Sequence, residues 1–391
     1  MDLKDLTRGS EEIIGAEEIE KKLKEGKKIR IKHGVDPNTT QLHLGYVINY
    51  RIMRRFQDCG HTVVLLLGDF TGRIGDPTDK LEARQGLSKE KLRQNAETLI
   101  KVATKVLDKD KLEVRYNSEW WDKMGLDKFL KLGSKISAVR LWERDMFERR
   151  VKQGKPVWTH EFLYPILQAQ DSVEIKSDLT VIGSDQKFNE LLGRELQKEA
   201  GQDPQALVIM PILPGTDGNE KMSQSLNNGI GIDEDPAEIY GKIMSMPDKN
   251  ILPYFTLLTD ISSSDLTTIK TEILSGVRNP RDVKMNLAYE IIKGLNGEDK
   301  AKEAEEKFKK VFQEKQTPQD IQTYQIEGEE FLLDILIKTN LASSRGEGRR
   351  LIDQKAVKIN DEVVTDAMFK IEKKDCPAVL KKGKRFFIKI I

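Results

Sequence analysis

Cysteines and long apolar runs are scarce in this chain of 391 residues. The two cysteines, Cys59 and Cys376, lie far apart, which excludes a disulfide scaffold and fits a reducing compartment. The longest obvious apolar run, residues 63–67, is far shorter than the roughly 20 residues of a membrane span. The amino terminus also has no apolar segment of the signal-peptide kind. We therefore expect a soluble cytoplasmic protein.

The chain as a whole has almost no excess charge, but its charge is segregated. Lysine and arginine number 65 against 64 acidic residues, a formal net charge of +1. Residues 331–391 hold 14 basic and 8 acidic side chains, a net +6, which leaves −5 for residues 1–330. A basic tail favours a polyanion such as RNA, with an ordinary solvated face as the alternative.

Strand and helix patterns alternate in the first half of the chain. Strand patterns cover residues 28–33, 63–67, 179–182 and 207–213, with helical patterns at 11–24, 44–60, 89–168 and 186–200. This order predicts an α/β fold with a doubly wound, Rossmann-type parallel sheet, and ligands that bind beyond the carboxyl ends of its strands.

The second half of the chain is predominantly helical and then changes character. Helical spacing dominates from Pro236, and residues 313–330 are typical of a linker. The basic tail combines a helix at 331–338, a second helix with a Ser344/Glu347 capping box, and strands near 357–364 and 385–391. We predict a catalytic domain with a helical insertion (1–230), an α-helical domain (231–325) and a small α+β RNA-binding domain (330–391).

Two polar segments suit phosphate chemistry. Asp36-Pro37 and then Leu42-His43-Leu44-Gly45-Tyr46 precede or open a helix, whose amino-terminal N–H groups attract anions. Lys221-Met222-Ser223-Gln224-Ser225 follows the last strand of the sheet and places one lysine where it can close over a pyrophosphate. Taken alone, the first segment is equally compatible with a helix cap or a surface residue, and the second is more typical of a solvated loop.

Together these segments resemble the HIGH and KMSKS signatures of class I aminoacyl-tRNA synthetases, in the order and separation that this family uses. Further blocks are similar to those of bacterial tyrosyl-tRNA synthetases: residues 68–77, 164–172, 183–189 and 240–245. The tail, from Ser344-Arg345 to Asn360, resembles the small RNA-binding domain that closes those enzymes.

The resemblance implies activation of tyrosine by ATP, with Mg²⁺ carried in by ATP and no tightly bound protein metal, and then transfer to tRNA(Tyr) by a homodimer. It implies catalytic roles for His43, Lys80, Arg84 and Lys221. It assigns ATP binding to Asp36, His43, Gly45, Tyr46, Gly183, Asp185, Lys221, Met222 and Ser223. It assigns tyrosine binding to Lys32, Gly34, Asp76, Tyr164, Gln168, Asp171 and Gln186, and tRNA binding to Arg345, Arg349, Arg350 and Lys355.

Several positions depart from the family pattern. Tyr46 and Gln224 replace the last histidine and the second lysine of the two signatures, and Asn38 replaces a threonine. In the tyrosine pocket, Lys32, Gln170 and Ile182 replace two tyrosines and a glycine. Three alternatives stay open: a paralogue that only binds RNA, a tyrosine-activating ligase with another acceptor, and the sister tryptophan enzyme.

Overall fold

A computed structural model describes residues 2–76, 86–142, 145–223, 226–312, 322–360, 362–383 and 386–391. The chain divides into two compact units, Met1–Glu298 and Asp299–Ile391. The three-domain division of the sequence analysis stays a prediction. Within the described ranges, no helix combines the length and the apolar content needed to cross a membrane.

A six-stranded sheet forms the centre of the first unit, in the order β1-β6-β5-β2-β3-β4. Its strands are β1 (Glu12–Ile14), β2 (Arg30–Val35), β3 (Thr62–Leu67), β4 (Leu112–Tyr116), β5 (Leu179–Gly183) and β6 (Ala206–Met210). Only β1 runs antiparallel to its neighbour. The chain order reverses between β2 and β5, which is the switch point of a doubly wound sheet. The predicted fold class is thereby confirmed.

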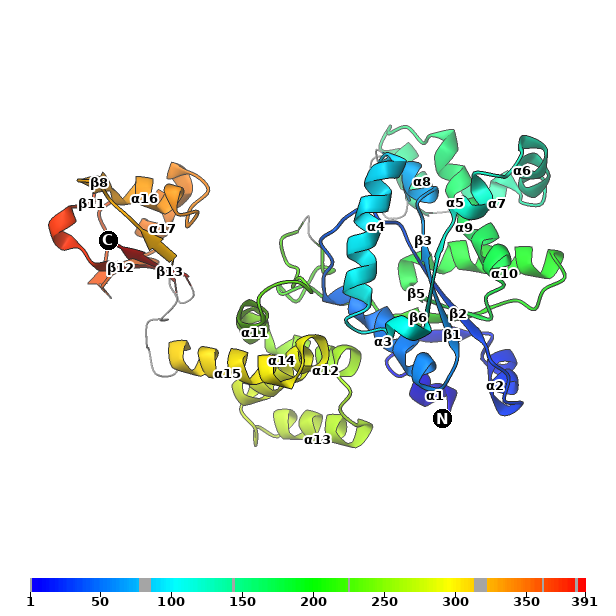
Figure 1. The fold of residues 1–391 in the computed structure, drawn as a ribbon, viewed down its shortest axis with the longest axis horizontal. Helices are drawn as coiled ribbons and strands as arrows, with labels where there is room; N and C mark the ends of the chain where they lie inside the picture. The colour runs from blue at the N-terminus through cyan, green and yellow to red at the C-terminus, as the bar shows by residue number, and fades with distance from the viewer. Residues whose placement is uncertain are drawn as a thin grey trace. The chain divides into compact units, whose positions relative to one another are not determined.

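Helices cover both faces of this sheet, with α4 on one side and α9 and α10 on the other (Figure 1). The helices that precede the helical region are α1 (Leu3–Leu6), α2 (Ala16–Lys24), α3 (Leu44–Asp58), α4 (Lys89–Ala103), α5 (Ser118–Trp121), α6 (Leu126–Gly133), α7 (Ala138–Trp142), α8 (Asp145–Lys152), α9 (Thr159–Ile175) and α10 (Lys187–Glu199). The helical region adds α11 (Pro236–Ser245), α12 (Ile251–Leu258), α13 (Ser263–Leu274) and α14 (Pro280–Asn296). Short 3-10 turns lie at Thr71–Arg73, Lys109–Lys111, Ser184–Gln186 and Asp248–Asn250.

The strands agree with the sequence patterns where burial is complete. Residues 63–67 of β3 are buried on both faces, as a continuous apolar run predicts. Two predictions were wrong. The helix expected over 11–24 begins only at Ala16, after the short edge strand β1, and β4 lies inside the stretch 89–168 that looked helical. Both strands lie at the edges of the sheet, and the half-buried residues of β4 give only a weak strand signal.

The second unit begins with α15 (Glu298–Phe312) and continues into a small α+β fold. Its five-stranded sheet has the order β10-β9-β12-β13-β7, and a separate pair joins β11 to β8. These strands are β7 (Gln322–Tyr324), β8 (Glu330–Phe331), β9 (Val357–Ile359), β10 (Glu362–Val363), β11 (Lys370–Ile371), β12 (Ala378–Lys382) and β13 (Phe386–Ile390), with helices α16 (Leu332–Lys338) and α17 (Arg345–Asp353) and a 3-10 turn at Lys373–Asp375.

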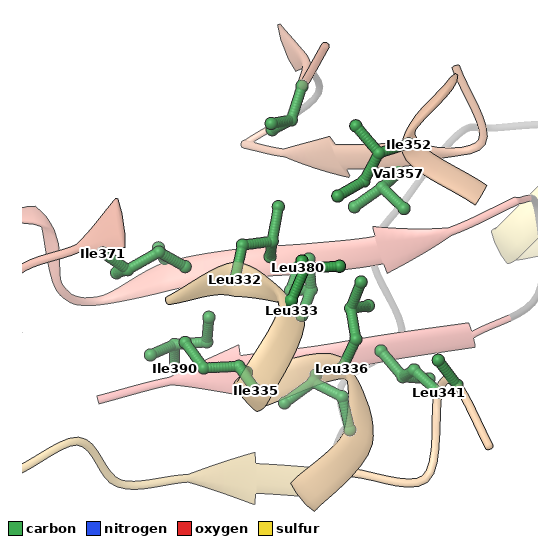
Figure 2. Packing of buried hydrophobic residues seen from close by; sticks show 14 of the residues in the cluster. Leu332, Leu333, Ile335, Leu336, Leu341, Ile352, Val357, Ile371, Leu380 and Ile390 are labelled. Carbon is green, nitrogen blue, oxygen red and sulfur yellow. The ribbon is translucent and has the colours of Figure 1, made fainter. Parts of the chain in front are cut away.

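The core of the small fold lies between α16 and its sheet. Figure 2 shows Leu332, Ile335 and Leu336 of α16 beside Leu380 and Ile390 of the strands, all of them buried. Part of the expected linker 313–330 is strand instead, because β7 pairs in parallel with β13. The Ser344 cap is confirmed, since its Oγ accepts from the Glu347 N–H, but the Glu347 carboxylate accepts from the N–H of Ser343.

Candidate active site

A cavity of about 410 Å³ opens at the carboxyl ends of β2, β5 and β6, next to the switch point of the sheet. Both sequence signatures contribute to its wall, through His43 and Lys221. Every described residue to which the sequence analysis assigned ATP or tyrosine lines it: Lys32, Gly34, Asp36, His43, Gly45, Tyr46, Asp76, Tyr164, Gln168, Asp171, Gly183, Asp185, Gln186, Lys221, Met222 and Ser223. Lys80 and Arg84 lie outside the described residues.

Backbone hydrogen bonds hold the chain around both signature segments in place. The Leu44 N–H donates to the Ile230 carbonyl at 2.9 Å, and the Ile232 N–H donates to the Leu42 carbonyl at 2.9 Å. On the other side, the Met222 N–H donates to the Leu213 carbonyl at 2.9 Å, just beyond β6. Met222 is therefore held against the chain after β6, and residues 230–232 are held against the turn before α3.

His43 caps α3 with its own side chain. Its Nδ1 accepts from the Gly45 N–H at 3.2 Å, which assigns the ring proton to Nε2. Burial lowers the pKa of His43 to about 4, so the ring is neutral at physiological pH. A Cβ at position 45 would lie 2.9 Å from the ring, so glycine is what allows the imidazole to fold back over the helix start. The ring thus presents an N–H donor and no charge.

The buried Tyr164 bonds to the partly buried Asp36 beside Gly68. The Tyr164 hydroxyl donates to Asp36 Oδ2 at 2.9 Å, and the Thr71 hydroxyl donates to Oδ1 at 2.6 Å. Burial raises the pKa of Asp36 to about 7. A Cβ on Gly68 would come within 1.9 Å of Asp36 Oδ1, so this close approach requires glycine. Because the Tyr164 hydroxyl donates its hydrogen bond to Asp36, the lone pairs of its oxygen are available to accept one from another group.

Asp171 is buried in the wall of the same cavity and accepts three hydrogen bonds from protein donors. The indole N–H groups of Trp120 and Trp121 donate to Oδ1 at 2.9 and 2.8 Å, and Asn117 Nδ2 donates to Oδ2 at 3.1 Å. Burial raises the pKa of Asp171 to about 6, against the opposing effect of these donors and of the Lys32 charge. The carboxylate is therefore ionised at neutral pH.

Lys32 forms a buried ion pair with Glu190, 2.9 Å from Nζ to Oε2, with both side chains at most 2 % exposed. Its Nζ also donates to Ser172 Oγ at 2.6 Å. Nothing in the local sequence around Lys32 identifies this partner, because Glu190 lies 158 residues further along the chain. Within the described ranges, no group of three or more His, Cys, Asp or Glu side chains is arranged to hold a metal ion.

Two family models together match residues 24–390 of the chain. Residues 24–313 match the model described as tRNA synthetases class I (W and Y), and residues 313–390 match a C-terminal domain described as SYY-like, of tyrosine–tRNA ligase. The chain belongs to the class I tRNA synthetases. Relatives of this family include the tyrosine–tRNA ligase of Thermotoga maritima, 45% identical over 388 residues that cover 99% of this chain and 96% of the relative. The tyrosine–tRNA ligase 2 of Clostridium acetobutylicum is 41% identical, covering 100% and 98%.

Solved class I synthetases share the fold. A C-terminally truncated mitochondrial tyrosyl-tRNA synthetase of Aspergillus nidulans superposes with a TM-score of 0.66 at 22% identity, covering 79% of this chain and 93% of its own. The tyrosyl-tRNA synthetase of Archaeoglobus fulgidus, solved with L-tyrosine, gives a TM-score of 0.62 at 22% identity, covering 78% and 98%.

Three departures from the synthetase pattern fall in different places. Ile182 and Asn38 line the cavity, and Gln224 lies outside the described residues. The expectation that Gln170 belongs to the pocket was wrong, because it pairs along α9 with Glu174 at 3.0 Å and is absent from the cavity lining. Sequence reasoning also missed Asn117, Trp120 and Trp121, for which the adjacent tryptophans were the only signal in the sequence.

The four basic residues that the sequence analysis assigned to tRNA lie on the surface of the second unit. Arg345, Arg349, Arg350 and Lys355 are all exposed, on α17 or just after it, and Arg345 pairs with Asp334. Lys381 does not contribute to an exposed basic face, because it is 8% exposed and its Nζ lies 5.4 Å from the centre of the Phe387 ring. The exposed set on α17 is therefore the better candidate for contacts with a phosphate backbone.

Proposed function

We propose that this chain activates L-tyrosine with ATP and transfers the tyrosyl group to the 3′ end of tRNA(Tyr). The observation that carries the proposal is that His43, Lys221 and Asp171, from three distant parts of the chain, line one cavity. In activation, a carboxylate oxygen of tyrosine bonds to the α-phosphorus of ATP while the bond to the β-phosphate oxygen breaks and pyrophosphate leaves. No proton moves in this step, so positioning and charge stabilisation are what the protein must supply.

ATP is proposed to occupy the end of the cavity formed by His43 and Lys221. The Nε2–H of the neutral His43 ring donates to a phosphoryl oxygen, and the start of α3 adds its N–H groups. Lys221 approaches the departing pyrophosphate, with Lys80 and Arg84 as further cations and Mg²⁺ arriving as part of the nucleotide substrate. Asp185, which is 3.2 Å from Gln186 Nε2, is proposed to bind the ribose hydroxyls.

Tyrosine is proposed to lie between Asp76 and Asp171. Its ammonium group meets Asp76, the Tyr164 oxygen and Gln168, and its phenol donates to Asp171. Donors from the described residues occupy three of the roughly four lone-pair positions of the Asp171 carboxylate, which leaves one for the phenol. Phenylalanine offers no donor there, so a buried anionic acceptor is left incompletely satisfied and the substrate is refused.

The partners are proposed from surface features. Arg345, Arg349, Arg350 and Lys355 would contact the tRNA backbone. A homodimer is proposed because apolar side chains of the helical insertion are exposed: Leu126, Leu130, Val139, Trp142, Val151 and Trp158, at 45 to 70%. Contiguous exposed apolar surface marks protein interfaces in soluble proteins. Sedimentation should give twice the mass of one chain, and charged substitutions at Leu130 and Val139 should yield monomers.

Pyrophosphate exchange with tyrosine, phenylalanine and tryptophan, each in the presence of ATP and Mg²⁺, tests the proposed activity. Exchange with tyrosine alone, followed by charging of tRNA(Tyr), is the expected result. Exchange without charging would favour a ligase with another acceptor, and exchange with tryptophan would favour the sister enzyme. A chain that binds tRNA but exchanges with no amino acid would be the RNA-binding paralogue.

A further inference from the structure

All the N–H donors of the buried Lys32 ammonium bond to other side chains of the protein. An ammonium has three N–H donors. Nζ lies 2.6 Å from Ser172 Oγ and 3.0 and 2.9 Å from the two oxygens of Glu190. No N–H is therefore left for a substrate atom, although the side chain lines the cavity. Its hydrogen bonds can therefore influence the amino acid only through the groups that accept them, Glu190 and Ser172.

Glu190 in turn determines which way the Gln168 amide faces. A carboxylate only accepts, so the Gln168 group that meets Glu190 Oε1 at 2.9 Å must be its NH₂. Gln205 Nε2 donates to the other oxygen at 2.7 Å, and both Lys32 and Glu190 are buried. The Gln168 oxygen is consequently directed away from Glu190, where it accepts from Asn189 Nδ2 at 2.8 Å.

The same chain of hydrogen bonds continues to the other carboxylate of the pocket. Asn189 Nδ2 also donates to Gln186 Oε1 at 3.0 Å, and Gln186 Nε2 donates to Asp76 Oδ2 at 2.9 Å. Three amides thus lie between two acceptor-only groups, Glu190 and Asp76. Reversing any one of them would oppose two donors or two acceptors, so the carboxylates fix all three orientations.

The middle amide of the three, that of Asn189, has an unsatisfied oxygen among the described residues. The Asn189 side chain is fully buried, and its Oδ1 has no hydrogen-bond partner in the described part of the chain. Leaving a buried acceptor unsatisfied destabilises a folded protein, because the group loses its hydrogen bonds to water. Such a group in a native structure calls for an explanation, and the fixed orientation of the three amides supplies one here.

We propose that Glu190, held in place by Lys32, is a positioning residue for the ammonium group of tyrosine, because it forces Gln168 to offer that group its oxygen and not its NH₂. The inference rests on the proposed function. Lys32 and Glu190 touch no substrate atom in this account. They act through Gln168, which accepts from the ammonium beside Asp76.

The test compares two ligands that differ only in the ammonium group: L-tyrosine and 3-(4-hydroxyphenyl)propanoate. Glu190→Gln keeps the shape but supplies a donor, so Gln168 is free to reverse. We expect the Kd of tyrosine to rise about tenfold or more, the effect of losing a hydrogen bond to a charged group, and the Kd of the propanoate to stay within twofold. In activation assays, the KM for tyrosine should rise while kcat and the KM for ATP change little.

The controls separate this role from general destabilisation. The control residue Glu199 lies on α10, as Glu190 does, and its side chain is 46% exposed. The variant Glu199→Gln should leave both Kd values unchanged. In the double variant Lys32→Met/Glu190→Gln no unpaired buried charge remains. The Kd of tyrosine should still rise more than the Kd of the propanoate. Equal weakening of both ligands, or no weakening, would overturn the inference. If the unaltered chain binds no tyrosine, the proposed function itself fails, and that result is distinct from the other two.

Discussion

His43 lies opposite Gly231 in an antiparallel bridge, so the turn before α3 is joined through the backbone to the chain that follows Ser223. The Gly231 N–H also donates to the Glu234 carboxylate at 2.8 Å, and Glu234 pairs with Lys242 at 2.6 Å. The turn that carries His43 is therefore joined to the chain shortly after the Lys221 segment, and Lys221 lines the same cavity as His43. We expect the two side chains to act on ATP as one unit.

A double-mutant cycle checks this coupling. The free-energy costs of His43→Ala and Lys221→Ala, measured from the rate of tyrosyl-adenylate formation, should be non-additive by about 0.5–3 kcal/mol, as for neighbours that share a ligand. Lys152→Ala serves as a control, because Lys152 is 72% exposed, lies outside the cavity and should add nothing. Strict additivity of His43 and Lys221 would mean that they contact different parts of the reaction.

Asp171→Ala should reduce the preference for tyrosine over phenylalanine by about 10- to 100-fold, because one hydrogen bond to a charged group is worth about 1.5–3 kcal/mol. The ratio of kcat/KM for the two amino acids is the measurement. Since this change also leaves Trp120 and Trp121 without an acceptor, Asp171→Asn should be measured in parallel. Unchanged selectivity in both variants would show that the phenol is recognised elsewhere.

The affinity for tyrosine should fall as the pH is lowered from 8 to 5. The pKa values of two cavity carboxyls are raised by burial, that of Asp36 to about 7 and that of Asp171 to about 6, so their anionic forms are lost in this range. The pKa of His43 is lowered to about 4, so the imidazole stays neutral and contributes no step. Titration of tyrosine binding by calorimetry should show the lower step disappear in Asp171→Asn, and a profile unaffected by that change would refute the assignment.

Gln224→Lys should raise the rate of tyrosyl-adenylate formation about tenfold, since one additional charge-assisted hydrogen bond to the leaving pyrophosphate is worth at least about 1.4 kcal/mol. Single-turnover measurements of the activation step give the rate directly. Gln224→Met, of similar length and without charge, is the matched control. A lysine that leaves the rate level or lowers it would mean that position 224 does not reach the pyrophosphate.

Removal of basic side chains from α17 should weaken tRNA binding without affecting tyrosine activation. For Arg349→Ala/Arg350→Ala, the slope of log K against log salt should become shallower by about 0.7–0.9 for each phosphate that the variant no longer neutralises. Lys374→Ala, 73% exposed and paired with Glu372, is a control in the same unit. A truncation for the same purpose belongs after residue 312 and not after 330, because β7 is part of the C-terminal sheet. Loss of activation in the arginine variant would contradict the separation of roles.

Local signals in the sequence were sufficient for the elements that carry the signatures. The apolar run of β3 and the helical spacing of α3 each depend on neighbours within a few residues, so their places in the fold could be predicted. The family blocks likewise indicated which side chains would gather. The described residues that they assigned to ATP or tyrosine line one cavity, whereas Gln170 does not. The edge strands β1 and β4 were missed because their short, half-exposed patterns become strands only through pairing with the sheet.

Tertiary structure alone decided how the gathered side chains are held. The packing of α9 against α10 brings Gln168 next to Glu190, and the pairing of β2 with β5 brings Lys32 within reach of both helices. The same folding places Trp120 and Trp121 on Asp171. Hydrogen-bond partners so far apart in the chain leave no periodic or local trace, because their meeting depends on the packing of whole elements. The sequence thus determined which groups the pocket contains, and the packing determined which way each of them faces.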